Sequence, residues 1–453
     1  MSFAYAYLVH SDTDRRQMLN TMGLSGIDEL FATIPDDLRL SRPLDLPAPL
    51  TAIELQRAMR RAAADCETTL SHLNFLGGGF YDHFVHPVVD AIVSRGEFLT
   101  SYTPYQPTIS QGMLGALHDY QALTSRIAGL PVVNSSCYDG ATAMADAAWM
   151  ACTATGRRTV VLARTVWPEW RDIVTLYLSG RGVRTAIAGH DNGTGRMKMN
   201  ECDADDVAAV ICQCPNALGV IEDISAIAAT SHSRGSLAIA AFNPLLSGVA
   251  EPPGRLGADI VCAEGQPLGL YLNGGGPGLG MLACSASLAP YMTGRIVAAS
   301  ERIESGRYEL VRQEREQHVA RERALSNICS NQALCAVRVA VHLTLLGETG
   351  YAALARTNMR LAQRLMGLLT DLPGVTRPYS GPFFNEFTLR LPCPAGPVLA
   401  ALRKEGIFGG LEMSWTGVDT DILVAVTETK TEDDLSFYAE KLAEIIAGKM
   451  SHV

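Results

Sequence analysis

Five short apolar runs in residues 159–264 constrain the fold of this chain more than any other feature. They are TVVLAR (159–164), VRTAIAG (183–189), VAAVICQC (207–214), SLAIAAF (236–242) and ADIVCAE (258–264). Each run has the length and near-continuous apolar character of a strand buried on both faces, and helical or loop segments separate the runs. Such strands, joined by crossovers, form a mostly parallel sheet covered by helices on both sides. The sequence therefore predicts an α/β fold.

In a parallel sheet, ligands bind at the carboxyl ends of the strands. The residues in that position are 167–169, 215–216, 243–244 and 264–266, and they are the first candidates for a ligand site. A second candidate is the turn at 139–142, which opens an Ala-rich helix. The free N–H groups and positive dipole end of such a helix favour an anion, either a phosphate or a carboxylate.

The 453 residues are too many for one typical domain, and we expect three parts. Residues 1–60 form an N-terminal arm of short helices and proline-rich linker, in which Ser25 suits the N-cap of a helix. Such an arm usually wraps a neighbouring domain or subunit. Residues 61–330 form a large domain. Residues 331–453 begin with a long helical connection and end as a small α/β domain, whose last helix we expect to end at Gly448.

Composition and charge argue against several classes of function. The net charge is −10 and Lys and Arg form no long block, so nucleic acid is not the expected partner. No apolar run reaches the roughly 20 residues that span a bilayer, and the first residues lack the pattern of a secretory signal. Most of the 11 cysteines are interpreted as small buried side chains in a reducing cytoplasm. Cys212 and Cys214 share one face of a strand, which is a weak signal for a metal.

The segment SYTPYQPTISQG (101–112), preceded by NFLGGGFYDHF (74–84), is polar, aromatic and interrupted by two prolines. This composition suits a rigid loop that presents hydroxyl, amide and ring groups to a ligand. The alternative interpretation is an ordered surface turn without a ligand. His83 and His86 could share a helical face, and a structural role is the preferred interpretation for both.

Seven stretches occur in an order that is specific as a set, although each stretch alone is not. They are NFLGGGFYDHF, EFLTSYTPYQPTISQG, YDGATAMADAAWMA, PNALGVIED, GADIVCAEGQPLG, GGGPGLG and REQHVARERALSNICSNQALC. Together they resemble subunit 1, the N-terminal half, of the P-protein family of the glycine cleavage system, over about residues 5–445. The resemblance implies fold type I, the fold of the pyridoxal-phosphate (PLP) enzymes that include the aspartate aminotransferases, with a large domain and a small C-terminal α/β domain.

The resemblance also implies an α2β2 assembly in which a lysine of subunit 2 holds PLP as a Schiff base. In the catalytic half of the family, that lysine precedes the proline of a GGGGPG stretch by eleven residues. The same interval before Pro277 leads to Gln266, whose amide cannot form an imine. Asn243 is the best match for the acid that pairs with the pyridine nitrogen, and it carries no charge. We therefore expect a degenerate cofactor pocket in this chain and a working site at an interface with the lysine-bearing partner.

The implied reaction releases CO2 from glycine and passes the aminomethyl group to the lipoyl arm of a carrier, the H-protein. In the family, the TPYQ and SNIC regions face the active site of the partner. The candidate contributors to the shared site are Tyr102, Thr103, Pro104, Tyr105, Gln106, Ser110, Gln111, Ser326 and Asn327. None is a strong acid or base near neutral pH, so the expected roles are to position substrate and to order water.

Three residues depart from the family pattern. Thr108 stands where Glu is usual, Trp167 where His is common, and Leu325 where Thr precedes SNIC. The lost carboxylate in the loop supports a second hypothesis, a divergent P-protein-like subunit that acts on another amino acid. A third hypothesis is a non-catalytic scaffold or regulator of the partner subunit.

Overall fold

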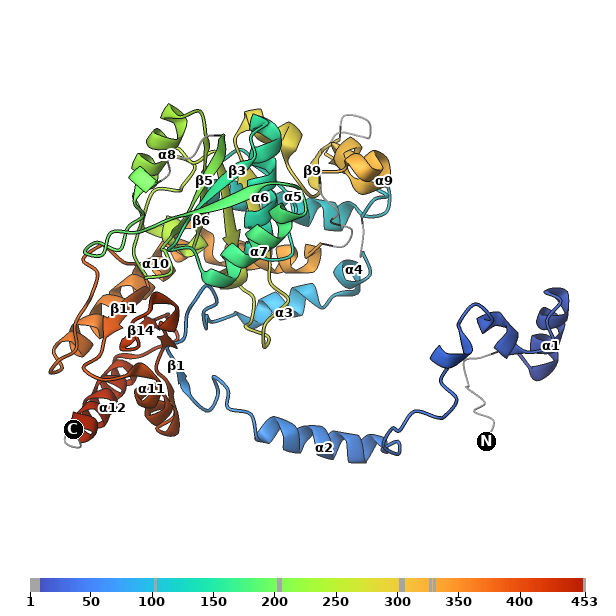
Figure 1. The fold of residues 1–453 in the computed structure, drawn as a ribbon, viewed down its shortest axis with the longest axis horizontal. Helices are drawn as coiled ribbons and strands as arrows, with labels where there is room; N and C mark the ends of the chain where they lie inside the picture. The colour runs from blue at the N-terminus through green and yellow to red at the C-terminus, as the bar shows by residue number, and fades with distance from the viewer. Residues whose placement is uncertain are drawn as a thin grey trace. The chain divides into compact units, whose positions relative to one another are not determined.

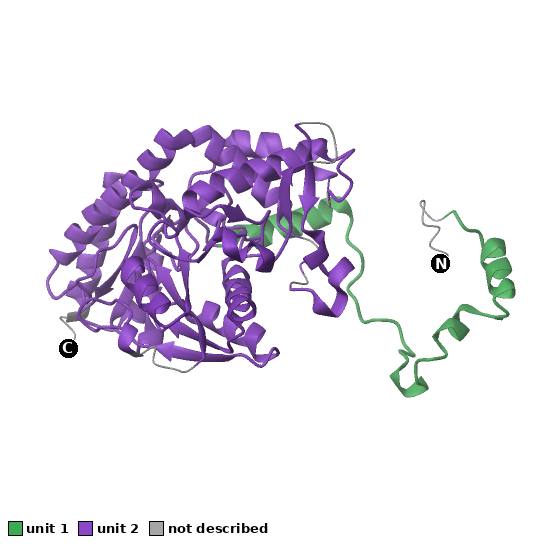
Figure 2. Ribbon diagram, turned by 90° about the horizontal axis from the view of Figure 1, so that it is seen from above, with its two compact units in different colours: residues 1–66 green, residues 67–453 purple. Residues whose placement is uncertain are grey.

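The computed structural model describes residues 9–101, 104–201, 206–300, 306–325, 328 and 331–450. The chain forms two compact units, which Figure 2 shows in different colours. The first unit is residues 1–66 and the second is residues 67–453.

The first unit consists of short helices joined by extended chain. The elements are α1 (Asp12–Thr21), the 3-10 turns η1 (Ile27–Phe31) and η2 (Asp36–Leu38), and α2 (Ala52–Ala64). The prediction of a helix capped by Ser25 is wrong, because Gly26 takes the N-cap position of η1. The backbone N–H and the hydroxyl of Ser25 both donate to the carboxylate of Glu29, so its oxygen caps no helix.

The core of the second unit is a seven-stranded sheet in the order β2-β8-β7-β6-β5-β3-β4. Figure 1 labels three of its strands, β3, β5 and β6. Its strands are β2 (Val132–Val133), β3 (Thr159–Ala163), β4 (Arg184–Ala188), β5 (Val207–Cys214), β6 (Leu237–Phe242), β7 (Ile260–Glu264) and β8 (Gly280–Cys284). Strands β3 to β7 run parallel to one another, whereas β8 is antiparallel to both β7 and β2. All five predicted strands are present within their predicted runs, so the mostly parallel sheet is confirmed.

Helices pack on this sheet through small or apolar side chains. They include α5 (Gln111–Ala128), α6 (Gly140–Thr155), α7 (Pro168–Ser179) and α8 (Ile224–Ser233). Most residues of α6 are buried and many of these are alanine, which lets the helix lie close to the strands beneath it, and α7 packs on α6. Gly129 closes α5 in the left-handed conformation, with φ of 73°.

A long helix, α10 (Ala333–Thr370), joins the sheet to the C-terminal part of the chain. It bends where Gly347 leaves the helical conformation, with φ of 60° and ψ of −179°. By length and composition, α10 is the one described helix long and apolar enough to cross a membrane. In its most apolar 18-residue stretch, 44% of residues are buried. Because α10 packs on α5 and on α12 (Glu432–Met450), its apolar side lies against the core of the chain.

The C-terminal part has its own small sheet and its own apolar core. The sheet has the order β11-β14-β13, formed by β11 (Glu386–Arg390), β13 (Leu411–Glu412) and β14 (Asp421–Ala425). Helices α11 (Ala395–Lys404) and α12 (Glu432–Met450) pack on each other beside it. The prediction that Gly448 ends the last helix is wrong, because α12 continues to Met450. Gly448 does not adopt the left-handed conformation that would stop a helix.

The remaining elements connect these layers. They are β1 (Leu73–Asn74), α3 (Pro87–Val93), α4 (Gly96–Leu99), η3 (Met199–Glu201), η4 (Pro244–Gly248), η5 (Gln266–Leu268), η6 (Ala286–Tyr291), β9 (Ile296–Ala299), β10 (Tyr308–Val311), η7 (Gln313–Arg315), α9 (Gln317–Ala320), η8 (Arg321–Arg323), β12 (Ile407–Phe408) and η9 (Ser414–Thr416). β1 pairs in parallel with β12, and β9 pairs antiparallel with β10. The β1–β12 pair attaches the glycine-rich stretch that follows β1 to the C-terminal part.

Candidate functional site

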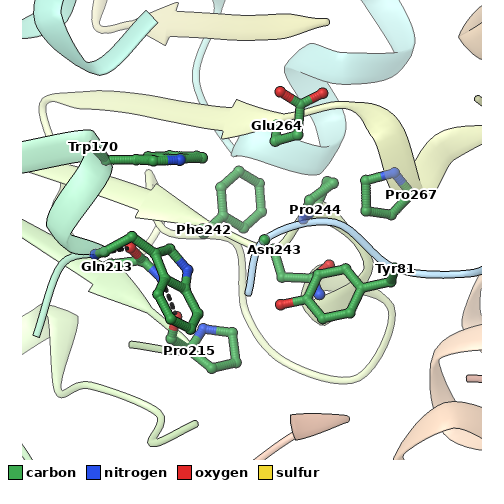
Figure 3. A pocket seen from close by; sticks show the side chains of 11 residues that line it. Tyr81, Trp170, Gln213, Pro215, Phe242, Asn243, Pro244, Glu264 and Pro267 are labelled. Carbon is green, nitrogen blue, oxygen red and sulfur yellow. Dashed lines mark hydrogen bonds between the residues drawn. The ribbon is translucent and has the colours of Figure 1, made fainter. Parts of the chain in front are cut away.

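A small pocket lies at the carboxyl ends of the parallel strands (Figure 3). Its lining residues are Gly79, Tyr81, Trp167, Trp170, Gln213, Pro215, Phe242, Asn243, Pro244, Glu264 and Pro267. Each of the four strand-end segments singled out in the sequence contributes to this lining. Sequence reasoning missed Tyr81, Gln213 and Trp170. Gln213 could have been identified as a candidate from the sequence, because it is the one polar residue in the apolar run of β5.

The pocket is almost filled by the chain's own side chains. The space left for the centre of a water molecule is about 20 Å³, which is enough for about one water molecule. Figure 3 shows the rings of Trp170, Phe242 and Tyr81 among the side chains that surround this space. A pyridine ring with a phosphate group does not fit in this space.

Gln266, at the predicted lysine position, begins η5, separated from the end of β7 by one residue, and is 2% exposed. Its amide nitrogen donates to the carbonyl oxygens of Tyr81 (2.8 Å) and Leu270 (3.1 Å). Its amide oxygen accepts the backbone N–H of Tyr81 at 2.9 Å. The side chain thus links the glycine-rich stretch to the end of β7, and it offers no amine to a cofactor.

Glu264 places a carboxylate at the start of α6, where the sequence predicts an anion site. One of its oxygens accepts the N–H of Gly140 at 3.0 Å. The other accepts the N–H groups of Gln266 (3.0 Å) and Leu279 (2.9 Å). Asp139 caps the same helix by accepting the N–H of Thr142 at 2.8 Å. The group that occupies this helix end is therefore a carboxyl group of the chain itself. Burial raises the pKa of Glu264 to about 7.

Asn243, the predicted counterpart of the pyridine-pairing acid, lies at the end of β6 and lines the pocket. Its side-chain oxygen accepts the N–H of Leu245 at 3.0 Å, and its nitrogen donates to Asn385 at 3.4 Å. It therefore caps η4 and carries no charge. Asn243 carries no charge, Gln266 offers no amine, and Glu264 occupies the start of α6. Together with the small volume, these features mean that the pocket does not fit PLP.

The glycine-rich stretch is held by a second buried carboxylate, Glu386 of β11. Glu386 accepts the N–H of Gly78 at 2.7 Å and the hydroxyl of Tyr81 at 3.2 Å. A Cβ on Gly77 would lie 1.9 Å from the Glu386 carboxylate, which explains a glycine at that position. Burial raises the pKa of Glu386 to about 7.

The Glu386 carboxyl is expected to make the chain less stable as the pH rises. Its pKa is about 7 in the folded chain against an ordinary value of 4.5, so the folded state binds the extra proton between those values. The free energy of unfolding therefore falls as the pH rises through that window. Glu386→Gln, which keeps an acceptor for Gly78, is expected to remove roughly 2–3 kcal/mol of this fall.

The measurement is urea unfolding from about pH 5 to about pH 8. Glu348→Gln is the matched control, because the side chain of Glu348 is 87% exposed and its loss should leave the pH profile unchanged. Equal profiles for Glu386→Gln and the wild type would contradict the prediction.

The described part of the predicted loop is anchored at one end by Gln111. The Gln111 amide donates to the carbonyl oxygens of Tyr308 (2.8 Å) and Pro107 (2.7 Å), and accepts the N–H of Tyr308 at 2.9 Å. Pro104 is buried, Tyr105 and Gln106 are exposed, and Ser110 is half-buried. The other candidates, Tyr102, Thr103, Ser326 and Asn327, lie outside the described residues.

The three departures from the family pattern lie in different surroundings. Thr108 is exposed on the loop. Trp167 is 6% exposed and lines the closed pocket. Leu325 is half-buried beside Arg315 and Glu316. Of the three, only Thr108 presents its side chain to solvent on the candidate loop.

The two histidines and the cysteine pair make structural contacts. His83 is buried and contacts the Glu428 carboxylate at 2.9 Å, and His86 caps α3 by accepting the N–H of Val88. Cys212 and Cys214 are buried in β5, and burial raises the pKa of Cys214 to about 12. Within the described ranges, no group of three or more His, Cys, Asp or Glu side chains is arranged to hold a metal ion.

Comparison with known proteins gives a consistent result. The family model described as "Glycine cleavage system P-protein" matches residues 5–442. The chain is 41% identical over 448 residues to a Chlorobium limicola protein named "Probable glycine dehydrogenase (decarboxylating) subunit 1", with 97% of this chain and 100% of that one covered. It is 39% identical, with a TM-score of 0.88, to a crystal structure of "glycine decarboxylase (P-protein) of the glycine cleavage system, in inhibitor-bound form", with coverage of 97% and 99%. A NifS-like protein shares the fold, with a TM-score of 0.62 at 14% identity over 83% of this chain and 99% of the other.

Proposed function

Because the chain belongs to the glycine cleavage system P-protein family, we propose that it is subunit 1 of a heteromeric, PLP-dependent glycine decarboxylase. The family and the fold class inferred from the sequence are confirmed by these similarities. The name "subunit 1" of its relatives implies a second subunit. In the proposal, that second subunit carries the lysine and this chain completes the site.

The single observation that carries this proposal is the small, nearly filled pocket at the strand ends. Gln266 supplies no amine, Glu264 occupies the end of α6, and the remaining space holds about one water molecule. A decarboxylase subunit with such a pocket needs a cofactor held elsewhere. The proposed holder is the lysine-bearing P-protein subunit 2 in an α2β2 complex, and the proposed compartment is the cytoplasm.

The proposed contribution of this chain to the shared site is the loop that follows α4. Its exposed residues Tyr105, Gln106 and Thr108 offer a ring, an amide and hydroxyl groups to a neighbour. These groups suit the positioning of glycine and the ordering of water. PLP on the partner would supply the electron sink for decarboxylation, and the aminomethyl group would pass to the lipoyl arm of the H-protein.

Reconstitution tests the proposal. The purified chain is mixed with a lysine-bearing subunit 2, and exchange of labelled CO2 into glycine is measured with each subunit alone and with the mixture. We expect an α2β2 complex and at least about a hundredfold more exchange in the mixture than in either subunit alone, since the site needs both chains. Full activity of subunit 2 alone would support the scaffold hypothesis and refute ours.

The exposed Thr108 supports a second candidate function, a subunit for another amino acid. A panel of amino acids on the same complex separates the two candidates. Glycine as the preferred substrate is our expectation. Activity on another amino acid, together with recovery of glycine exchange in Thr108→Glu but not in Thr108→Gln, would favour the divergent subunit.

A further inference from the structure

We propose that Arg295 is a buried positioning residue that holds the candidate loop in place through Tyr105. The inference rests on the proposed function, because it concerns the loop that we assign to the shared site. Arg295 immediately precedes β9 and is only 3% exposed. Strand β9 lies beside α5, the helix that the loop enters.

The Arg295 guanidinium holds the loop through Tyr105. One of its terminal nitrogens donates to the Tyr105 hydroxyl oxygen at 3.0 Å. The guanidinium carbon also lies 4.9 Å from the centre of the Tyr105 ring, so a cation–π contact adds to the hydrogen bond. Tyr105 is 41% exposed, and its orientation therefore depends on this buried partner more than on packing.

The same guanidinium holds the segment that leads into α10. Its other terminal nitrogen donates to the side-chain oxygen of Asn331 at 3.1 Å. Asn331 in turn donates to the hydroxyl of Ser135 at 3.2 Å, and the Ser135 N–H donates to the Arg295 carbonyl at 2.7 Å. Ser135 follows β2 of the central sheet, so the arrangement is connected to that sheet.

Neighbouring charges favour this position for a cation. Glu316 is 8% exposed, and burial raises the pKa of its carboxyl group. The positive charge of Arg295 lowers this pKa by a smaller amount. The ring of His318 meets the Tyr105 ring edge-on, with centroids 5.4 Å apart. Arg295 therefore lies among a tyrosine, an asparagine and a buried carboxylate. A planar guanidinium can donate to Tyr105 and Asn331 at once, which a lysine ammonium on a flexible stem does less well.

Amide hydrogen exchange of the free chain tests the inference without any requirement for activity. In Arg295→Met, we expect the backbone amides of residues 105, 106 and 108–110 to exchange at least about tenfold faster, while those of α6 and β5 keep their protection. Tyr105→Phe, which leaves the fold untouched, should loosen the same amides. Arg295→Lys should give an intermediate effect. Arg126→Met is the matched control, because Arg126 pairs with Glu348 at the surface.

The complex with subunit 2 supplies the functional readout. For Arg295→Met and Tyr105→Phe we expect intact assembly, a lower kcat or a higher KM for glycine, and partial rescue by Arg295→Lys. The double variant should lose little more than Arg295→Met alone, since both changes remove one contact. Unchanged exchange of residues 105–110 in Arg295→Met, or equally faster exchange throughout residues 67–453, would overturn the inference. A wild-type complex without glycine exchange would instead refute the proposed function, and the exchange data would still decide the role of Arg295.

Discussion

A chain that carries Gln266→Lys is expected to bind no PLP covalently, although the substitution places an amine at the position where the family resemblance expects the cofactor lysine. The pocket has space for about one water molecule, and the Glu264 carboxylate already accepts the N–H of Gly140 at the start of α6. A new amine changes neither of these features. The missing lysine is thus one of several obstacles to PLP, and its return should not restore the site.

The same substitution is expected to lower the free energy of unfolding by roughly 2–4 kcal/mol. An ammonium group can donate to the carbonyl oxygens of Tyr81 and Leu270, as the Gln266 amide does. It cannot accept the Tyr81 N–H, which then loses its partner in a buried place. The ammonium also carries a charge into a buried position beside the pocket, where Glu264 is the one carboxylate among the lining residues.

The measurement combines two readings on Gln266→Lys, Gln266→Met and the wild type. A visible aldimine band that persists through gel filtration after incubation with PLP, and that borohydride then abolishes while the pyridoxyl group stays on the chain, reports covalent binding. Urea unfolding reports stability. Gln266→Met is the matched control, because it has similar length and no charge. Stoichiometric PLP on the Gln266→Lys chain would show that the lysine alone was missing and would contradict our account of the pocket.

Gly280→Ala is expected to destabilise the chain by about 3 kcal/mol or more. A Cβ at position 280 would lie 2.3 Å from the Asp139 carbonyl oxygen and 2.6 Å from the Cys137 Cβ. The backbone cannot simply move away, because Gly280 and Cys137 exchange two backbone hydrogen bonds, of 2.8 and 3.2 Å. Gly280 also pairs with Glu264 across β7 and β8, so any shift disturbs the carboxylate at the start of α6.

Gly367→Ala in α10 is the matched control for this methyl addition. No atom lies within 4 Å of a Cβ at that position, and the backbone is helical. Alanine there is expected to stabilise the chain by roughly 0.5–1 kcal/mol. Urea unfolding measures both variants. Similar stabilities of Gly280→Ala and Gly367→Ala would mean that β8 and the turn before α6 are not packed as closely as described.

The sheet could be predicted because its signals are local. Each buried strand is a continuous apolar run. The end of a helix is often indicated by one or two residues, as Gly129 indicates the end of α5. The two errors have local causes as well. Glu29 takes the hydrogen bonds of Ser25, and Gly448 stays helical although glycine is the usual residue after a helix end.

The details of the site could not be predicted because they depend on contacts between distant residues. Glu264 reaches Gly140 across 124 positions, and Glu386 reaches Gly78 across 308. The Arg295–Tyr105 contact spans 190 positions. A local pattern of hydrophobicity or turn residues does not indicate which distant residues contact each other. The sequence could indicate an absent lysine, but not the carboxylate that fills the end of α6.

The most direct test of the central claim is to locate the cofactor in the active complex. The complex with subunit 2 is reduced with labelled borohydride in the presence of PLP, and labelled peptides of both chains are mapped. This chain has five lysines, namely Lys198, Lys404, Lys430, Lys441 and Lys449, and none of them lines the pocket. We predict about one label per αβ pair, all of it on a lysine of subunit 2. Stoichiometric label on any lysine of this chain would contradict a site whose cofactor this chain does not hold.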